Sequence, residues 1–411
     1  MSADTSHISN GQLVMAATPA AADGPEHVTE PTAYDAILLA GFGGPEGQDD
    51  VIPFLRNVTR GRGIPDERLE EVAHHYRHFG GVSPINAQNR ALKAALEAEL
   101  ASRGIDLPVL WGNRNWDPYL EEAVQEAADK GYAKLLAIAT SAYSSFSGCR
   151  QYREDFARVL ESTGLQGTVF IDKVRQFFDH PGFVRPFVDG VRNAIAEAVV
   201  ANEGLDVATE LHILFSTHSI PSTDAERSGP AARGFDEHGA YAAQHAAVGQ
   251  VVLDTAWAEF LDTPLGAAFA GSALPPWKLV YQSRSGPPTQ PWLEPDINDY
   301  LHELEGGPTR AVVIVPLGFV SDHMEVMWDL DEEATETAGE LGFWSTRTPT
   351  PGVDPAYVTG LVDLVLERRD ATPVEERPHL TDLGPWYDVC RPGCCENIRA
   401  GFKPAVAGLQ P

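Results

Sequence analysis

The sequence predicts an α/β protein of two similar domains, each built on a parallel sheet. Two observations support this prediction. From Tyr34 onward, short apolar runs alternate with longer polar stretches, an order typical of parallel strands joined by helices. The second half of the chain also repeats motifs of the first half at an offset that stays between 170 and 176 residues. A length of 411 residues suits two domains.

In the first half, runs rich in β-formers predict strands, and polar stretches with helical periodicity predict helices. The expected strands lie at 35–41, 108–111, 133–139 and 168–174, and the helices at 66–79 and 86–102. The first strand leads into Phe42-Gly-Gly-Pro-Glu46, whose glycines permit a tight turn close to a ligand. The chain contains no Gly-x-Gly-x-x-Gly or Walker pattern, so this turn alone is a weak signal.

The second half repeats this plan, with expected strands at 211–215, 278–281 and 311–315. The corresponding positions are Phe42 and His218, Trp111 and Tyr281, Pro118 and Pro291, Ala142 and Gly318, and Phe183 and Tyr357. Agreement in order and spacing at all of these positions indicates an internal duplication. We therefore expect the strand-end loops of both halves to face a shared cleft, where ligand sites concentrate.

The repeat and the shifts in composition define four segments. We expect a disordered N-terminal tail at 1–32, a first domain at 33–178, a second domain at 179–370, and a C-terminal tail at 371–411 that carries a cysteine motif.

Composition excludes several classes of protein. A formal charge of −29 argues against a nucleic-acid partner, which calls for basic patches. No apolar run approaches the ~20 residues of a membrane span, and the N-terminal tail lacks the basic and apolar regions of a signal peptide. Four cysteines are too few for a disulfide scaffold and suit a reducing compartment. The sequence thus predicts a cytoplasmic protein without stable membrane insertion.

The stretch 211–221 delivers one imidazole, His218, to the carboxyl end of a buried strand. Ligands of open α/β sheets bind outside the carboxyl ends of the strands. His218 is therefore a candidate for chemistry, although a loop histidine satisfied by its neighbours is the ordinary alternative.

A second informative stretch begins at Gly318, where Glu325, Asp329 and Glu333 recur every four residues. A helix would stack these carboxylates on one face. A solvated acidic face is the alternative for a generic helix, but this row starts just after a strand end, level with His218. We expect His323 to orient Asp322 or Glu325 rather than to bind a metal itself.

These side chains offer two kinds of metal ligand. Oxygen ligands alone suit Mg²⁺ or Ca²⁺, whereas an imidazole with a carboxylate suits a first-row transition metal such as Fe²⁺. A row of carboxylates that leads to a His/Glu pair would form a path for a cation with a delivery point at its end.

The cysteines form a separate candidate site. Cys390, Cys394 and Cys395 lie close together in the C-terminal tail, and Cys149 follows the third strand of the first half. Four thiolates are the common ligand set of iron–sulfur clusters. A structural zinc site fits the number of ligands equally well, and the residues alone leave both alternatives open.

Three motifs occur in a recognisable order: Phe215-Ser-Thr-His218-Ser-Ile-Pro221, Pro291-Trp292-Leu293 and Gly318-Phe-Val-Ser-Asp-His-Met-Glu325. Together with the segments 41–45 and 80–84, they resemble the ferrochelatases, which insert ferrous iron into a porphyrin to make haem. The resemblance covers about residues 34–368. It implies two Rossmann-like domains related by a pseudo-twofold axis, with the porphyrin held in the cleft between them.

The resemblance also assigns residues. It implies His218 and Glu325 as the catalytic iron-site pair, with His218 as the primary base or iron ligand, and Asp329 and Glu333 as a continuing outer row of metal ligands. The positions matched to porphyrin contacts are Phe42, Tyr76, Ser83, Tyr152 and Trp292. Phe42 is a departure, because several relatives carry a tyrosine there that reaches the product iron, and phenylalanine has no such oxygen.

Relatives with this kind of tail carry a [2Fe–2S] cluster, so the resemblance implies a cluster on Cys149, Cys390, Cys394 and Cys395 and favours it over zinc. Members with a polar entrance loop act on coproporphyrin III, and the loop after Gly43 is polar here. The resemblance therefore implies Fe²⁺ and coproporphyrin III as substrates, with transient contact with neighbouring haem-pathway enzymes. The alternatives are protoporphyrin IX as the substrate, a chelatase for cobalt or nickel, and a haem- or metal-binding relative without catalysis.

Overall fold

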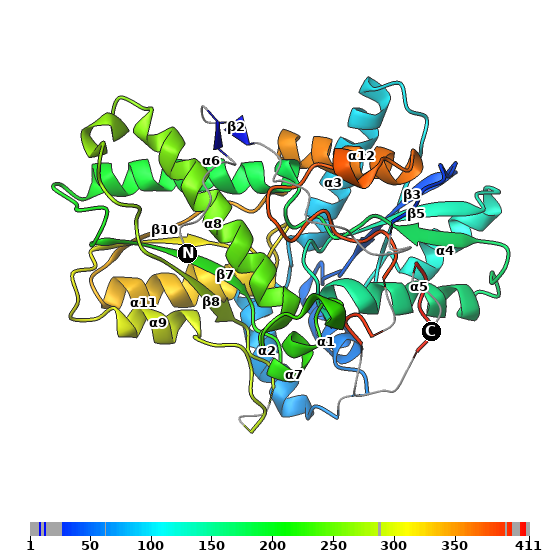
Figure 1. Ribbon diagram of the computed structural model, residues 1–411. Coiled ribbons are helices and arrows are strands. Elements are labelled where there is room, and N and C mark those ends of the chain that lie inside the picture. The colour runs from blue at the N-terminus through cyan, green and yellow to red at the C-terminus, as the bar shows by residue number, and fades with distance from the viewer. Residues whose placement is uncertain are drawn as a thin grey trace.

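Two four-stranded parallel sheets form the framework of the molecule (Figure 1). The structure is a computed structural model, and it describes residues 8–9, 12–13, 27–61, 63–286, 289–390, 393–396 and 403–407. The first sheet contains β3 (Ala36–Gly41), β4 (Val109–Asn113), β5 (Lys134–Ala139) and β6 (Phe170–Lys173). The second contains β7 (Leu211–His218), β8 (Trp277–Gln282), β9 (Ala311–Val315) and β10 (Trp344–Arg347).

Both sheets have the same topology. The spatial orders are β4-β3-β5-β6 and β8-β7-β9-β10, so the first strand of each half pairs with the second and the third. The predicted α/β fold with an internal duplication is confirmed by this agreement.

The second sheet differs from the sequence prediction at two places. β7 continues past residue 215 to His218, because its pairing with β8 extends to His218 and Gln282. β10 was not predicted, and the reason is its sequence: this edge strand reads Trp-Ser-Thr-Arg and is half-buried throughout, so it contains no apolar run.

Helices cover the sheets and the space between them (Figure 1). The longer helices of the first half are α1 (Val51–Val58), α2 (Asp66–His78), α3 (Ile85–Ser102), α4 (Leu120–Asp129) and α5 (Gln151–Ser162). Those that follow are α6 (Pro181–Ala201), α8 (Gly239–Leu261), α9 (Ile297–Glu303), α11 (Thr335–Glu340) and α12 (Pro355–Arg369). Shorter pieces are α7 (Ser222–Glu226), α10 (Met324–Val326) and the π-helices η3 (Phe146–Arg150) and η6 (Met327–Ala334).

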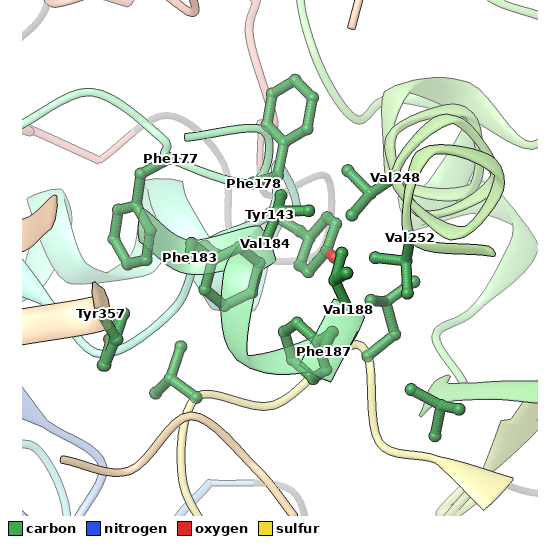
Figure 2. Packing of buried hydrophobic residues seen from close by; sticks show 14 of the residues in the cluster. Tyr143, Phe177, Phe178, Phe183, Val184, Phe187, Val188, Val248, Val252 and Tyr357 are labelled. Atoms are coloured by element: carbon green, nitrogen blue, oxygen red, sulfur yellow. The ribbon is translucent and has the colours of Figure 1, made fainter. Parts of the chain in front are cut away.

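One hydrophobic core runs through both halves. It includes residues of β3 and α3 from the first half and of β7 and α8 from the second, with α6 and α12 between them. Figure 2 shows Phe183 and Phe187 of α6 among Tyr143, Val248 and Tyr357. Because burying one such aromatic ring contributes about 1.5–3 kcal/mol, this shared core fixes the two sheets against each other.

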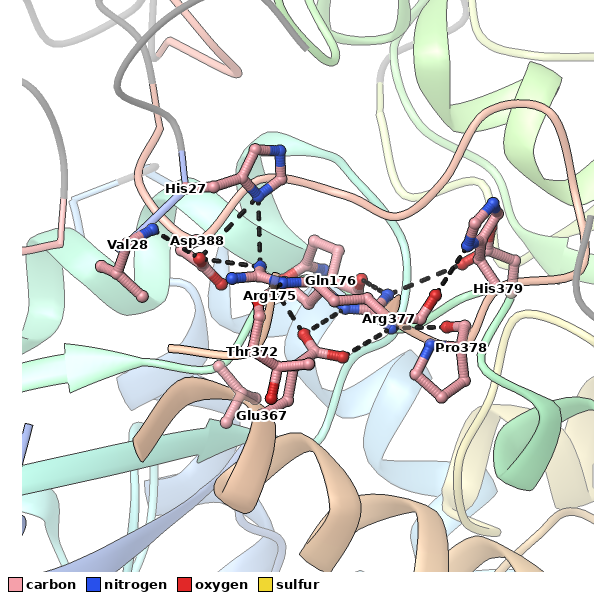
Figure 3. A network of polar contacts seen from close by, with 12 residues as sticks. His27, Val28, Arg175, Gln176, Glu367, Thr372, Arg377, Pro378, His379 and Asp388 are labelled. Carbon is pink, nitrogen blue, oxygen red and sulfur yellow. Dashed lines mark hydrogen bonds and ion pairs between the residues drawn. The ribbon is translucent and has the colours of Figure 1, made fainter. Parts of the chain in front are cut away.

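A buried polar network anchors the C-terminal segment (Figure 3). Arg175 makes two hydrogen bonds to the Glu367 carboxylate, of 2.7 and 3.2 Å, and Arg377 pairs with Asp388 at 2.8 Å. His27 lies 3.1 Å from Arg377, so residues at the start of the described chain also join the network. Residues 27–32 of the expected N-terminal tail therefore pack on the protein, whereas most of that tail lies outside the described residues.

Within the part of the chain that the structure describes, no helix is long and apolar enough to cross a membrane.

Candidate active site

The carboxyl ends of β7 and β9 bring His218 and Glu325 together. His218 ends β7, and Glu325 lies in α10, which follows the loop after β9. His218 Nε2 lies 3.6 Å from Glu325 Oε1, and the two side chains are 31% and 46% exposed. The two side chains therefore lie side by side at the carboxyl end of the second sheet, where a ligand can reach them.

The tautomer of His218 follows from its hydrogen bonds. Nδ1 lies in hydrogen-bonding contact with the carbonyl oxygen of Ser219, and because a carbonyl only accepts, Nδ1 must carry the proton. In the neutral ring, Nε2 is then unprotonated and faces Glu325. Nε2 is thus the atom that can accept a proton or bind a metal.

The two groups shift each other's pKa. Burial by itself would lower the pKa of His218, but the charge of Glu325 and its hydrogen bond outweigh burial and raise that pKa to about 8. Burial would likewise raise the pKa of Glu325, but His218 outweighs it and lowers that pKa to about 2. At neutral pH His218 is therefore an imidazolium and Glu325 a carboxylate. A divalent cation could take the place of the His218 proton once His218 releases it.

Gln282, at the end of β8, holds both members of the pair in place. Its backbone carbonyl accepts from Ser219 N at 2.8 Å, and its side-chain amide donates to the Glu325 carbonyl at 3.2 Å. The amide oxygen accepts from Ser216 Oγ at 2.8 Å. The sequence analysis missed Gln282, because a polar residue at a strand end does not reveal which backbone it will bond.

Tyr241 of α8 supports His218 from the interior. Its hydroxyl donates to the His218 carbonyl at 2.9 Å and lies 2.7 Å from Thr217 Oγ1. Gly318 packs closely against Thr217. A Cβ atom on residue 318 would lie only 2.6 Å from Thr217 Cβ and 2.9 Å from Thr217 Cα. The loop after β9 therefore needs glycine at this position to approach β7.

His323 orients Glu325, as the sequence analysis expected. Its Nδ1 accepts from the Glu325 backbone N–H at 3.2 Å and caps α10, and it lies 3.9 Å from Glu325 Oε2. Because this lone pair is used by the cap, the same nitrogen is not available as a metal ligand.

The carboxylate row continues outward from Glu325 on a π-helix rather than on the expected α-helix. Asp329 accepts from Ser283 Oγ, and Ser283 adopts a left-handed backbone (φ 60°) beside it. Burial first, and then the charges of Glu325 and Glu333, raise the pKa of Asp329 to about 7. Glu333 is exposed and accepts from Trp328 Nε1 at 2.8 Å. The row therefore leads from solvent to the His218–Glu325 pair.

The first half supplies an aromatic wall. Phe42, which follows β3, is 38% exposed, and its ring packs edge-on against Phe54, which also contacts Tyr76 and Trp116. Burial raises the pKa of Tyr76, and so do the charges of Glu325 and Asp329. Tyr76 is therefore close enough to the second half for the charges of its carboxylates to act on the Tyr76 hydroxyl.

The other residues matched to porphyrin contacts occupy three different places. Ser83 is buried against the turn after β3, with its N–H donating to the Pro45 carbonyl at 2.9 Å. Trp292 pairs with Pro221 just beyond His218. Tyr152 is only 3% exposed and packs in the core of the first sheet beneath Arg114. Ser83 and Trp292 thus adjoin the site, and Tyr152 stays a prediction that its burial does not favour.

Two segments of the first and second halves meet at the outer end of the carboxylate row. The Trp328 ring stacks on His75 of α2, with centroids 4.1 Å apart and planes 6° apart. His78 Nε2 lies 3.7 Å from Glu332 Oε1. These contacts join α2 to η6 across the two halves.

The four cysteines converge, although Cys149 is remote in sequence from the others. All four are buried and reduced, and they form one cluster. Cys394 Sγ lies 3.9 Å from Cys395 Sγ, and Cys395 Sγ accepts from Gly229 N at 3.2 Å. Among the described residues no group of side chains is arranged as a ready-made metal site. The four buried thiols match the kind and number of ligands that an iron–sulfur cluster takes, and the same set suits a zinc ion.

The chain is similar to known proteins in sequence and, more distantly, in structure. A sequence model described as ferrochelatase matches residues 34–369. A coproporphyrin III ferrochelatase of Leifsonia xyli subsp. xyli is 68% identical over 97% of this chain and 100% of its own. A coproporphyrin III ferrochelatase of Tropheryma whipplei is 55% identical over 92% of this chain and 93% of its own. Among solved structures, SirB from Bacillus subtilis with Fe³⁺ is similar over 85% of this chain and 100% of its own, at 12% identity and a TM-score of 0.44.

Proposed function

The chain belongs to the ferrochelatase family, and we propose that it inserts Fe²⁺ into coproporphyrin III to give the iron porphyrin in haem synthesis. It is accordingly an enzyme of the lyase class. The observation that carries this proposal is the His218–Glu325 pair, 3.6 Å apart at the carboxyl end of the second sheet. The identity to named relatives supports the choice of porphyrin.

Insertion requires the porphyrin to lose two pyrrole protons while Fe²⁺ takes their place. Once His218 has released the Nε2 proton that it holds at neutral pH, Nε2, directed at Glu325 because Nδ1 is committed to Ser219, accepts one pyrrole proton as a general base. The Glu325 carboxylate holds the metal or accepts the second proton. Asp329, whose pKa is about 7, can exchange a proton with solvent near neutral pH. Fe²⁺ would approach along Glu333 and Asp329, whose carboxylates favour a divalent cation.

An anaerobic assay tests this function directly. The loss of free-porphyrin absorbance is followed with Fe²⁺ and either coproporphyrin III or protoporphyrin IX. We expect turnover with coproporphyrin III, its loss in His218→Ala with porphyrin binding retained, and near-normal rates in His302→Ala, an exposed histidine of α9. A His218→Ala variant with near-native turnover would remove this assignment, and preference for protoporphyrin IX would overturn the substrate.

We further propose a [2Fe–2S] cluster on Cys149, Cys390, Cys394 and Cys395. When bound, such a cluster supplies a redox-active, strongly coloured centre. The buried thiols and the Gly229 N–H support it, since N–H donors to sulfur are typical of these sites. Visible absorption and electron paramagnetic resonance of anaerobically purified protein test the proposal. A colourless protein that contains zinc and no iron would refute it.

We also propose that the enzyme works in the cytoplasm, with transient contacts with neighbouring enzymes of haem synthesis. The small number of cysteines, with no disulfide between them, supports this location. Cell fractionation tests it, and recovery of the protein in a membrane or extracellular fraction would contradict it.

A further inference from the structure

The metal-handling residues and the aromatic wall belong to different halves of the molecule. His218 and Glu325 follow strands of the second sheet, whereas Phe42 and Tyr76 belong to the first half. Insertion of a metal into a ring held between them requires the two halves to be aligned closely. A 1 Å misplacement of reacting groups can cost about 100-fold in rate.

One hydrogen bond joins these halves at the loop that carries Glu325. The backbone N–H of Asp322, three residues before Glu325, donates to Gln88 Oε1 at 3.0 Å. Gln88 lies in the first turn of α3, in the first half. We propose that Gln88 is a positioning residue for iron insertion. Gln88 sets the position of Glu325 relative to the aromatic wall of the first half. This inference rests on the proposed function.

The first-half end of this connection is firmly fixed. Asn86, two residues before Gln88, donates to the carbonyl oxygens of Gly44 and Asp117, at 3.1 Å each, and accepts from Asn113 at 3.2 Å. Gly44 lies in the turn after β3 that begins with Phe42. These hydrogen bonds therefore hold the amino end of α3 against the turn that carries Phe42.

The second-half end is also fixed. The Asp322 carboxylate accepts from Thr350 Oγ1 at 3.0 Å and from Arg347 Nη1 at 3.3 Å. Arg347, in turn, bonds Asp331 on η6, the helix that continues the carboxylate row. Asp322 is thus the point at which the Glu325 loop, β10 and η6 meet, and Gln88 connects this point to the first half.

Gln88 and Gln282 act at different places. Gln282 holds the Glu325 carbonyl from within the second half and sets its distance to His218. Gln88 holds the start of the same loop from the other half. Loss of Gln88 should therefore leave the His218–Glu325 pair formed but displaced relative to the bound ring. Gln88 is only half-buried and borders a cavity of about 610 Å³, so a side chain of similar size replaces it without crowding.

The test compares two variants of Gln88 in the full-length enzyme. Gln88→Met keeps the shape but removes the acceptor, and Gln88→Glu restores an acceptor oxygen. We expect kcat for iron insertion to fall about tenfold or more in Gln88→Met, with the Kd for coproporphyrin III from fluorescence quenching within twofold of wild type. Gln88→Glu should recover kcat to within about threefold. Gln250→Met is the matched control: Gln250 is a half-buried glutamine whose amide bonds Asp254 and Trp277 of the second half, and kcat should stay unchanged in this variant.

Three results would overturn the proposal: a near-normal kcat in Gln88→Met, an equal loss in Gln88→Glu, or a loss of porphyrin affinity as large as the loss of kcat. Amide hydrogen exchange at Asp322 gives a readout that does not depend on turnover. It should accelerate in Gln88→Met and not in Gln88→Glu, and unchanged exchange in Gln88→Met would also overturn the proposal. If the wild type inserts no iron, the proposed function falls, whereas the exchange result still decides whether Gln88 holds the loop.

Discussion

Removal of the Glu325 charge should lower the pKa of His218 by well over one unit. In the wild type that pKa is about 8, because Glu325, 3.6 Å away, outweighs the effect of burial. In Glu325→Gln, the Ser219 hydrogen bond and the charge of Asp329 still raise the pKa, but burial is the larger effect, so the pKa should fall to 6.5 or below. At pH 6.5, a pKa of about 8 leaves about 3% of His218 neutral, whereas the variant would have half or more of it neutral.

The measurement is a proton–carbon NMR titration of the imidazole signals, with His218 assigned from its absence in His218→Ala. Glu333→Gln is the control, because the main influences on the His218 pKa are burial, Glu325, Ser219 and Asp329, so this variant should leave the pKa near 8. The assay does not require turnover, so a loss of activity in Glu325→Gln does not obscure it. A wild-type pKa at or below 6.5, or one unchanged in Glu325→Gln, would refute the reasoning.

The same pKa shifts set the pH range in which the pair stabilises the fold. The pKa of His218 is raised, so its contribution is complete below pH 6.5 and is lost as the pH rises through about 8. The pKa of Glu325 is lowered, so its contribution is complete above pH 4.5 and is lost as the pH falls through about 2.

Three further variants probe the support of the site and of the tail. Gly318→Ala should destabilise the protein by about 1–3 kcal/mol in urea unfolding and slow iron insertion, because the new methyl group would press on the Thr217 backbone; an unchanged midpoint would contradict this. Tyr241→Phe should lower the free energy of unfolding by about 1 kcal/mol, because the His218 carbonyl and Thr217 lose a buried hydrogen-bond partner. An unchanged midpoint of thermal unfolding would show that these bonds contribute nothing. Asp388→Asn should cost about 2 kcal/mol at pH 7, since Arg377 and His27 lower the pKa of Asp388 from 3.8 to about 2 against the effect of burial. This cost should shrink as the pH falls below 3.8, and a cost independent of pH would contradict the assignment.

Sequence patterns could predict the strands other than β10, the duplication and the candidate metal residues, because these depend on local order. Apolar runs specify buried strands, and β7 delivers His218 where the pattern places it. The four-residue carboxylate row pointed to Glu325, and the motif resemblance paired it with His218; the two side chains lie 3.6 Å apart in the structure.

Contacts between distant segments could not be predicted in this way. Gln88, Tyr241 and Gln282 support the site through hydrogen bonds to backbone groups, and any glutamine or tyrosine could do the same elsewhere. The π-helix η6 escaped prediction because its sequence has the four-residue spacing of an ordinary amphipathic helix. The tail network around Arg175 was missed because buried ion pairs have no local signature.

The matching topology of the two sheets has a consequence for redesign. Equivalent strand tips bear Phe42 in one half and His218 in the other, each supplied by a separate stretch of polypeptide. Under the proposed function, a substitution that alters the ring-facing surface around Phe42 leaves the backbone that carries His218 intact, so the two surfaces can be redesigned separately.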